Sequence, residues 1–99
     1  LMASNKGLRV LKVFKALQGN TLYGLSNKEI ADIVETTPVN VVRDLDDLIA
    51  EGLVERLENG RFVHGMQVLK IAVAHQREVQ KMRARLDEVE QRIVRGSIN

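Results

Sequence analysis

Two helix-start signals stand close together in the middle of this chain and restrict its fold more than any other feature. Ser26 and Glu29 can form a capping box, in which each side chain accepts a hydrogen bond from the other residue's backbone amide. Thr37 is a favourable N-cap, and Pro38 suits the first helical position, where a missing N–H costs nothing. The sequence therefore predicts three consecutive elements: a helix over 27–34, a turn over 35–37 and a helix over 38–51.

A further helix is predicted upstream, over residues 6–18, and Gly19-Asn20 ends it. Its apolar residues recur at helical spacing and predict a buried stripe of Val10, Leu11, Phe14 and Leu17. Its four cations lie off that stripe, and we expect a solvated face of Lys6, Arg9, Lys12 and Lys15, with contact to phosphate as the alternative. The two later helices have inward stripes of their own: Ile30, Ala31 and Val34, then Val41, Leu45, Leu48 and Ile49.

Short β segments surround these helices. Residues 21–25 can make a minimal strand, and residues 53–57 and 61–64 read as two strands joined by Glu58-Asn59-Gly60, because Asn-Gly is a strong hairpin signal. The order helix, short strand, helix, turn, helix, hairpin is that of a winged helix-turn-helix. We therefore expect a mostly α fold with a small β wing over residues 6–64, followed by one long C-terminal helix over residues 65–95.

The layout has a known physical use. The helix after the turn, about 38–51, enters the major groove of duplex DNA by its N-terminal end, where side chains reach base edges. The hairpin over 54–64 is the wing, which lies along the DNA backbone or enters the minor groove. The layout alone thus favours a sequence-specific reader of double-stranded DNA.

Four segments resemble the DNA-binding domain of IclR-type bacterial transcriptional regulators: residues 25–31 (LSNKEIA), 41–45 (VVRDL), 51–56 (EGLVER) and 60–65 (GRFVHG). The resemblance covers roughly residues 7–74 and implies a transcription regulator of bacterial or phage origin. Family members usually carry a large C-terminal effector-binding domain, where this sequence has only a helix. No small-molecule effector is therefore expected, and the chain is either a stand-alone variant or a fragment.

By position, the resemblance assigns Thr37, Val39, Asn40 and Arg43 to DNA contact. Arg43 matches the family's frequent recognition-helix arginine, and arginine is suited to guanine O6 and N7 or to phosphate. Asn40 stands where the family usually has a hydroxyl residue, and asparagine is suited to adenine. The alternative for Arg43 is a solvated helix residue paired with Asp47, four positions later.

Two further cations, Arg56 and Arg61, flank the hairpin tip and are candidates for contact with phosphate or the minor groove. The alternative is a cross-strand charge pattern with Glu55 and Glu58. Three acids on the recognition helix would repel phosphate if they faced it: Asp44, Asp46 and Asp47. We interpret them as a solvated acidic face rather than a metal site, since no histidine joins them at ligand spacing.

The C-terminal segment over 65–95 contains no proline and no internal glycine, which predicts one long helix. Its core positions alternate in steps of three and four residues from Val68 to Ile93, the pattern of a coiled-coil seam. That seam consists of Ala72, His75, Val79, Met82, Leu86, Val89 and Ile93. At His75 two imidazoles would approach each other in a dimer, and their protonation would disfavour pairing. A dimer affinity that is flat between about pH 5.5 and pH 8 would contradict this hypothesis.

Flanking charges favour a parallel, in-register pair of such helices. Glu78 then faces Arg83 of the second copy, and Arg85 faces Glu90, so both contacts are attractive. We therefore expect a parallel homodimer that presents two recognition helices to a roughly palindromic site. The competing interpretation is a helix that folds back on its own domain.

The charge distribution keeps a second class of function open. Residues 1–64 hold eight basic and nine acidic side chains, a net charge of −1, whereas residues 65–99 hold seven and four, a net charge of +3. Because nucleic-acid readers usually have a basic surface, a winged-helix module that binds or assembles proteins without DNA remains the alternative. Binding of structured RNA by the same fold is a third, weaker hypothesis.

The sequence does not support an enzyme, a metal- or cofactor-binding protein or a membrane protein. The absence of cysteine excludes disulfides and thiolate metal sites. No Gly-rich phosphate loop, nucleophile–histidine pair or metal motif is present, so we expect neither an enzyme nor a bound cofactor or metal. No run of about 18 apolar residues and no signal-peptide layout occur, so we expect a cytoplasmic protein without a membrane partner.

Overall fold

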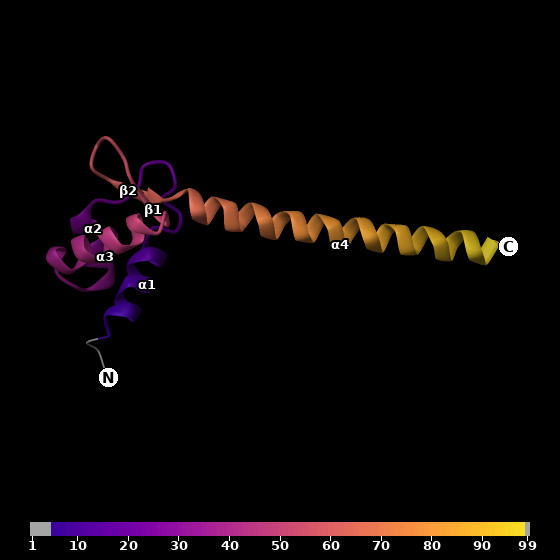
Figure 1. Ribbon diagram of the computed structural model, residues 1–99, viewed down its shortest axis with the longest axis horizontal. Helices are drawn as coiled ribbons and strands as arrows, with labels where there is room; N and C mark the ends of the chain where they lie inside the picture. The colour runs from indigo at the N-terminus through magenta and orange to yellow at the C-terminus, as the bar shows by residue number, and fades with distance from the viewer. Residues whose placement is uncertain (1–4, 99) are drawn as a thin grey trace. The chain divides into compact units, whose positions relative to one another are not determined.

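The computed structural model of the protein describes residues 5–98, and the side chains of residues 5–96. The elements are α1 (Lys6–Ala16), α2 (Asn27–Val34), α3 (Pro38–Ala50), β1 (Val54–Arg56), β2 (Phe62–His64) and α4 (Met66–Ile98). The chain divides into two compact units, of which the first ends at Leu69 and the second begins at Lys70. The predicted fold class is confirmed: a mostly helical winged-helix fold with a two-stranded sheet, followed by one long helix (Figure 1).

Local capping bonds begin the helices where the sequence predicts. The Glu29 amide donates to the Ser26 hydroxyl at 3.1 Å and the Ser26 amide donates to the Glu29 carboxylate at 2.8 Å, which completes the capping box of α2. At the start of α3 the Asn40 amide donates to the Thr37 hydroxyl at 3.2 Å, and Pro38 occupies the first turn. Three of the otherwise unpaired amide donors at these helix ends are thereby satisfied.

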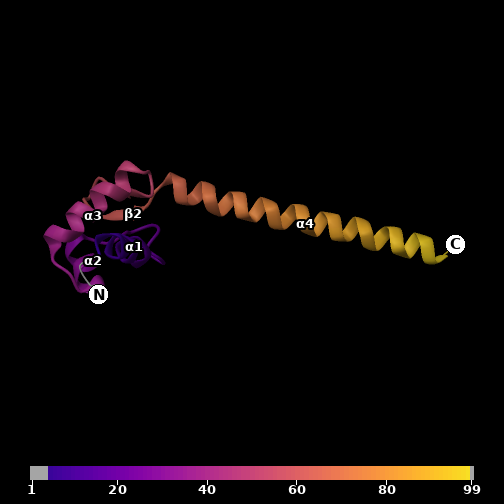
Figure 2. The same cartoon turned by 60° about the horizontal axis from the view of Figure 1, so that its bottom comes forward.

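One hydrophobic core joins the three helices of the first unit to the sheet. Helix α3 packs against both α1 and α2 and contacts β1, and Figure 2 views α1 almost end-on with α3 passing over it. The buried side chains that form this core are those of Val13, Leu17, Leu25, Ile30, Ala31, Val41, Leu45, Leu48, Val54 and Phe62. The inward stripes expected for α2 and α3 are largely confirmed, although Val34 is only half-buried and Ile49 is 39% exposed.

One residue of the buried stripe predicted for α1 is wrong. Val13 is fully buried, whereas Leu11 is 58% exposed. Val13 lies three residues after Val10 and four before Leu17, so it shares their side of the helix, and the packing of α1 against α2 and α3 turns that side inward. Helix α1 also ends at Ala16, two residues earlier than expected.

The minimal strand predicted over residues 21–25 is wrong except at its last residue. Residues 21–23 form turns, and the Gly24 amide donates to the Asn20 carbonyl at 3.0 Å. Leu25 alone bridges to Phe62, with bonds of 3.0 and 2.8 Å. Gly24 has a positive φ of 71°, and a Cβ there would lie 2.4 Å from the Phe62 carbonyl oxygen. Glycine is therefore required where this turn meets the wing.

The wing is a short antiparallel hairpin in which Val54 pairs with His64 and Arg56 with Phe62. Its strands are shorter than the predicted segments 53–57 and 61–64. The Leu57 amide donates to the Arg61 carbonyl at 2.7 Å, and Gly60 has a φ of 85°, so the loop is a three-residue turn that needs glycine at its last position.

Helix α4 extends over Met66–Ile98, slightly beyond the predicted 65–95. Its first turn is tied to the end of α3, because the Gln67 amide donates to the Gly52 carbonyl at 3.1 Å. Within the described residues, no helix is long and apolar enough to cross a membrane. The same part of the chain contains no group of three or more His, Cys, Asp or Glu side chains that could hold a metal ion.

Candidate nucleic-acid interface

Helix α3 presents to solvent one face that carries both polar and apolar side chains. Its buried side is formed by Val41, Leu45 and Leu48, and the opposite side carries exposed Val39, Val42, Arg43 and Asp46. Residues three and four positions apart share a face of a helix, so these four side chains form a continuous strip along the outward side. We call them the α3 outer face.

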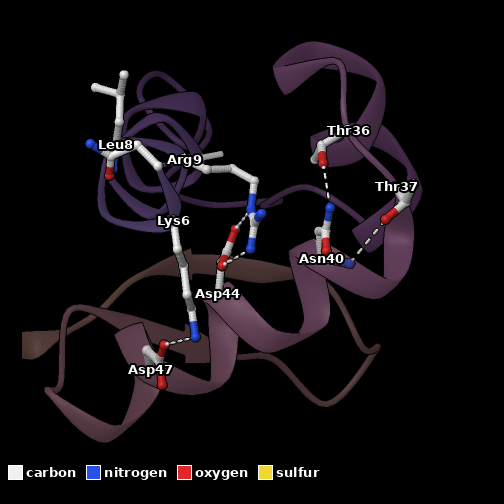
Figure 3. A network of polar contacts seen from close by, with 9 residues as sticks. Lys6, Leu8, Arg9, Thr36, Thr37, Asn40, Asp44 and Asp47 are labelled. Carbon is white, nitrogen blue, oxygen red and sulfur yellow. Dashed lines mark hydrogen bonds and ion pairs between the residues drawn. The ribbon is translucent and has the colours of Figure 1, made fainter. Parts of the chain in front are cut away.

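Asp44 does not belong to this face. Its side chain is fully buried, and the Arg9 guanidinium of α1 donates to both carboxylate oxygens, from Nε at 2.7 Å and from Nη2 at 2.9 Å (Figure 3). These hydrogen bonds, with the attraction of the carboxylate, raise the pKa of Arg9 above its usual value. The expectations that Arg9 lies on a solvated face and that Asp44 lies on an acidic one are therefore wrong. The pair joins α1 to α3 and removes one negative charge from the surface.

Asp47 is compensated in a different way. The Lys6 ammonium lies 3.1 Å from its carboxylate, with both side chains more than half exposed (Figure 3). The pairing of Arg43 with Asp47, which was the alternative for that arginine, is thus not formed. Of the three acids on α3, Asp46 is left without an ion pair among the described residues. The helix repels phosphate much less than its sequence suggests.

Arg43 is exposed, and within residues 5–98 no hydrogen bond or ion pair engages its guanidinium. Its five N–H donors are therefore free for an external acceptor. Val39, one turn earlier on the same face, is 62% exposed. Thr37 is exposed too, but its hydroxyl already accepts the cap bond from the Asn40 amide.

The Asn40 side chain is held within the helix-turn-helix. Its Nδ2 donates to the Thr36 hydroxyl at 3.0 Å, and the residue is half-buried. Reading adenine requires both the donor and the acceptor of the amide. In this structure the amide instead fixes the turn between α2 and α3, an arrangement visible at the right of Figure 3.

The two wing arginines lie in different surroundings. Arg61 donates from Nε to the Tyr23 carbonyl and from Nη2 to the Gly24 carbonyl, each at 3.0 Å, and its guanidinium lies 2.8 Å from the Glu29 carboxylate. Arg56 instead lies over the Phe62 ring, 5.8 Å from its centroid. Neither arginine forms the cross-strand pairs considered with Glu55 and Glu58.

Arg61 thus fastens the wing to the turn before α2 and to the capping box. The Ser26 backbone amide and hydroxyl, with Arg61, lower the pKa of the Glu29 carboxyl below its usual value. A side chain with three intramolecular contacts has fewer donors left for a nucleic acid than Arg43 has. Of the wing cations, Arg56 is more available for phosphate.

The predicted dimer seam on α4 is open to solvent in this structure. Its exposed large members are Met82 (67%), Leu86 (57%), Val89 (43%) and Ile93 (64%), Ala72 and His75 are exposed too, and Val79 is half-buried. The described ion pair of this unit joins Glu88 to Arg92 at 2.8 Å within the helix. Apart from His75, the seam is thus a row of apolar side chains that are mostly exposed.

Comparisons with known proteins bear on the fold. No protein-family model matches this chain, and no curated protein matches it. The structure is similar to a solved crystal structure of an IclR homolog from Microbacterium sp. strain HM58-2, with a TM-score of 0.60 and 19% sequence identity. The matched part covers 70% of this chain and 29% of that protein, so the chain spans less than a third of its length. The likeness shows an IclR-like winged-helix fold.

Proposed function

We propose that this chain acts as a small transcription regulator rather than an enzyme, and that it recognises duplex DNA by sequence. The carrying observation is Arg43, an exposed arginine that has no hydrogen-bond or ion-pair partner among the described residues and lies on the outer face of the helix that follows the turn. In a winged helix-turn-helix this helix lies in the major groove. Burial of Asp44 and pairing of Asp47 lower the electrostatic cost of that position.

The proposal gives each predicted contact residue a role. Arg43 reads guanine or grips phosphate, and Val39 lies beside it on the α3 outer face. Thr37 and Asn40 set the position of the helix start. Arg56 approaches the backbone or minor groove from the wing, while Arg61 holds the wing in place.

We further propose that α4 pairs two copies of the chain as a parallel coiled coil. The support is the exposed seam together with the attractive charges at Glu78 and Arg83 and at Arg85 and Glu90. A helix of this length spans about 50 Å, enough for three to four heptads. Such a dimer presents two recognition helices, so the site is expected to be roughly palindromic.

A second candidate is a protein-interaction module of the same fold. It is favoured by the net charge of −1 over residues 1–64 and by two apolar side chains beside the wing, Leu22 and Tyr23, which are 84% and 82% exposed. The two candidates differ in their response to salt, because neutralising DNA phosphates releases counterions and makes affinity fall steeply as salt rises.

The deciding experiment is a fluorescence-anisotropy titration of a labelled random-sequence duplex pool at low and moderate salt. We expect salt-sensitive binding that Arg43→Ala weakens by roughly 1–3 kcal/mol. Arg77→Ala, which removes an exposed arginine from α4 instead, is the matched control and should change affinity little. An Arg43→Ala protein that binds like wild type would refute the role of α3. No binding at either salt would favour the protein-interaction module.

A further inference from the structure

The α3 outer face carries two apolar side chains beside its free cation. Val39 is 62% exposed and Val42 is 45% exposed, and Arg43 lies between them and the later turns of the helix. A single exposed valine is ordinary on a protein surface. Two of them next to the unpartnered arginine, in the first turns of the helix that follows the turn, form a small apolar strip with one charge at its edge.

Few polar side chains near this strip are available to form hydrogen bonds with bases. The Asn40 amide donates to Thr36, and the Thr37 hydroxyl serves the helix cap. Arg43 is therefore the main hydrogen-bonding reader that the start of the helix offers. Any sequence discrimination beyond the base that Arg43 contacts has to come from apolar contacts or from the shape of the DNA.

One group in the major groove suits an apolar strip. Thymine presents its C5 methyl there, whereas the other three bases present hydrogen-bonding groups without a methyl. Valine in a helix holds one strongly preferred χ1 rotamer, so its methyl groups meet a partner with little loss of side-chain entropy. The two valines thus offer preset apolar surfaces that suit contact with a thymine methyl group.

We propose that Val39 and Val42 select thymines by contact with their C5 methyl groups, next to a guanine contacted by Arg43. This inference rests on the proposed insertion of α3 into the major groove and adds the chemistry of the site that α3 selects. Each half-site then contains thymine close to one guanine. Asn40 acts as a positioning residue and does not specify adenine.

The test replaces thymine by uracil, which removes only the C5 methyl and keeps every hydrogen-bonding group of the base. A binding site is first selected from the random duplex pool with the wild-type protein. Each thymine of the selected site is then replaced singly, and affinity is measured by anisotropy. We expect a loss of about fourfold at two thymines per half-site, the change that corresponds to about 0.8 kcal/mol per buried methyl group.

Variants assign each effect to its side chain. Val39→Ser should abolish the sensitivity to uracil at one of these thymines and Val42→Ser at the other, because a serine offers no methyl for the contact. Ile33→Ser, at an apolar residue of α2 that is 56% exposed, is the matched control and should leave both sensitivities unchanged.

The outcomes separate this inference from the proposed function. Absence of salt-sensitive duplex binding overturns both. If Arg43→Ala weakens binding but no uracil replacement changes the affinity, the thymine contact alone is overturned. The same holds if uracil lowers the affinity equally for wild type and for both serine variants. A selected site without thymine near its guanine does the same.

Discussion

Replacement of Arg9 by methionine removes both hydrogen bonds that reach the Asp44 carboxylate, at 2.7 and 2.9 Å, while keeping most of the side-chain volume. Asp44 is fully buried, so its negative charge is left without a partner and without water. Breaking a buried pair in this way costs about 3–5 kcal/mol. A domain of about 65 residues has a total free energy of unfolding of only about 3–10 kcal/mol. The Arg9→Met protein should therefore be at the margin of folding.

Asp44→Asn is the informative companion. The amide is nearly isosteric and carries no charge, and the freed Arg9 guanidinium, 24% exposed, can reach water. We expect a loss of about 1.5–3 kcal/mol, the range for a hydrogen bond to a charged group. The double variant should be more stable than Arg9→Met alone, because a buried neutral amide without a partner costs less than a buried carboxylate.

Urea unfolding followed by circular dichroism gives the free energy of unfolding of all four proteins. The expected order of stability is wild type, Asp44→Asn, the double variant, and Arg9→Met. An Arg9→Met protein within about 1 kcal/mol of wild type would refute the burial argument. So would a double variant whose loss equals the sum of the two single losses, because additivity means that the side chains do not interact.

Three further predictions follow from other parts of the chain. Gly24→Ala should destabilise the protein by about 1–3 kcal/mol more than Gly19→Ala. Both glycines have a positive φ, but only a Cβ at Gly24 meets the Phe62 carbonyl. Equal losses of stability in thermal unfolding would contradict this. The folded-state pKa of Glu29 is lowered, so its stabilising effect is present above the usual pKa of a glutamate carboxyl and is lost as the pH falls through the lowered folded-state pKa. Glu29→Gln should flatten this acid limb of the stability curve, and an unchanged slope would speak against it. Leu86→Lys should convert the proposed dimer to a monomer in sedimentation equilibrium, and a dimer that persists would exclude the α4 seam as the interface.

The local signals in the sequence were sufficient for most of the fold. Ser26 with Glu29, and Thr37 with Pro38, begin helices through bonds between neighbours in the chain, so their effect does not depend on distant residues. The hairpin around Gly60 is local for the same reason. The bounds of these elements were predicted correctly to within one residue at each end.

What the sequence did not predict depends on contacts between distant segments. Arg9 and Asp44 are 35 residues apart, and nothing local marks the pair. One signal was available: Asp44 lies three residues after Val41 and four before Leu48, on the buried side of the helix, where a charge needs a partner. The anchoring of Arg61 by the Tyr23 carbonyl, 38 residues away, has no sequence signature at all.

Modified bases can show whether Arg43 brings α3 to base edges in the major groove. In a site selected with the wild-type protein, each guanine is replaced by 7-deazaguanine, which removes the N7 acceptor that arginine contacts. We expect that this replacement at one guanine per half-site lowers the affinity of the wild-type protein and does not lower that of Arg43→Ala further. Equal sensitivity of wild type and Arg43→Ala at every guanine would contradict it.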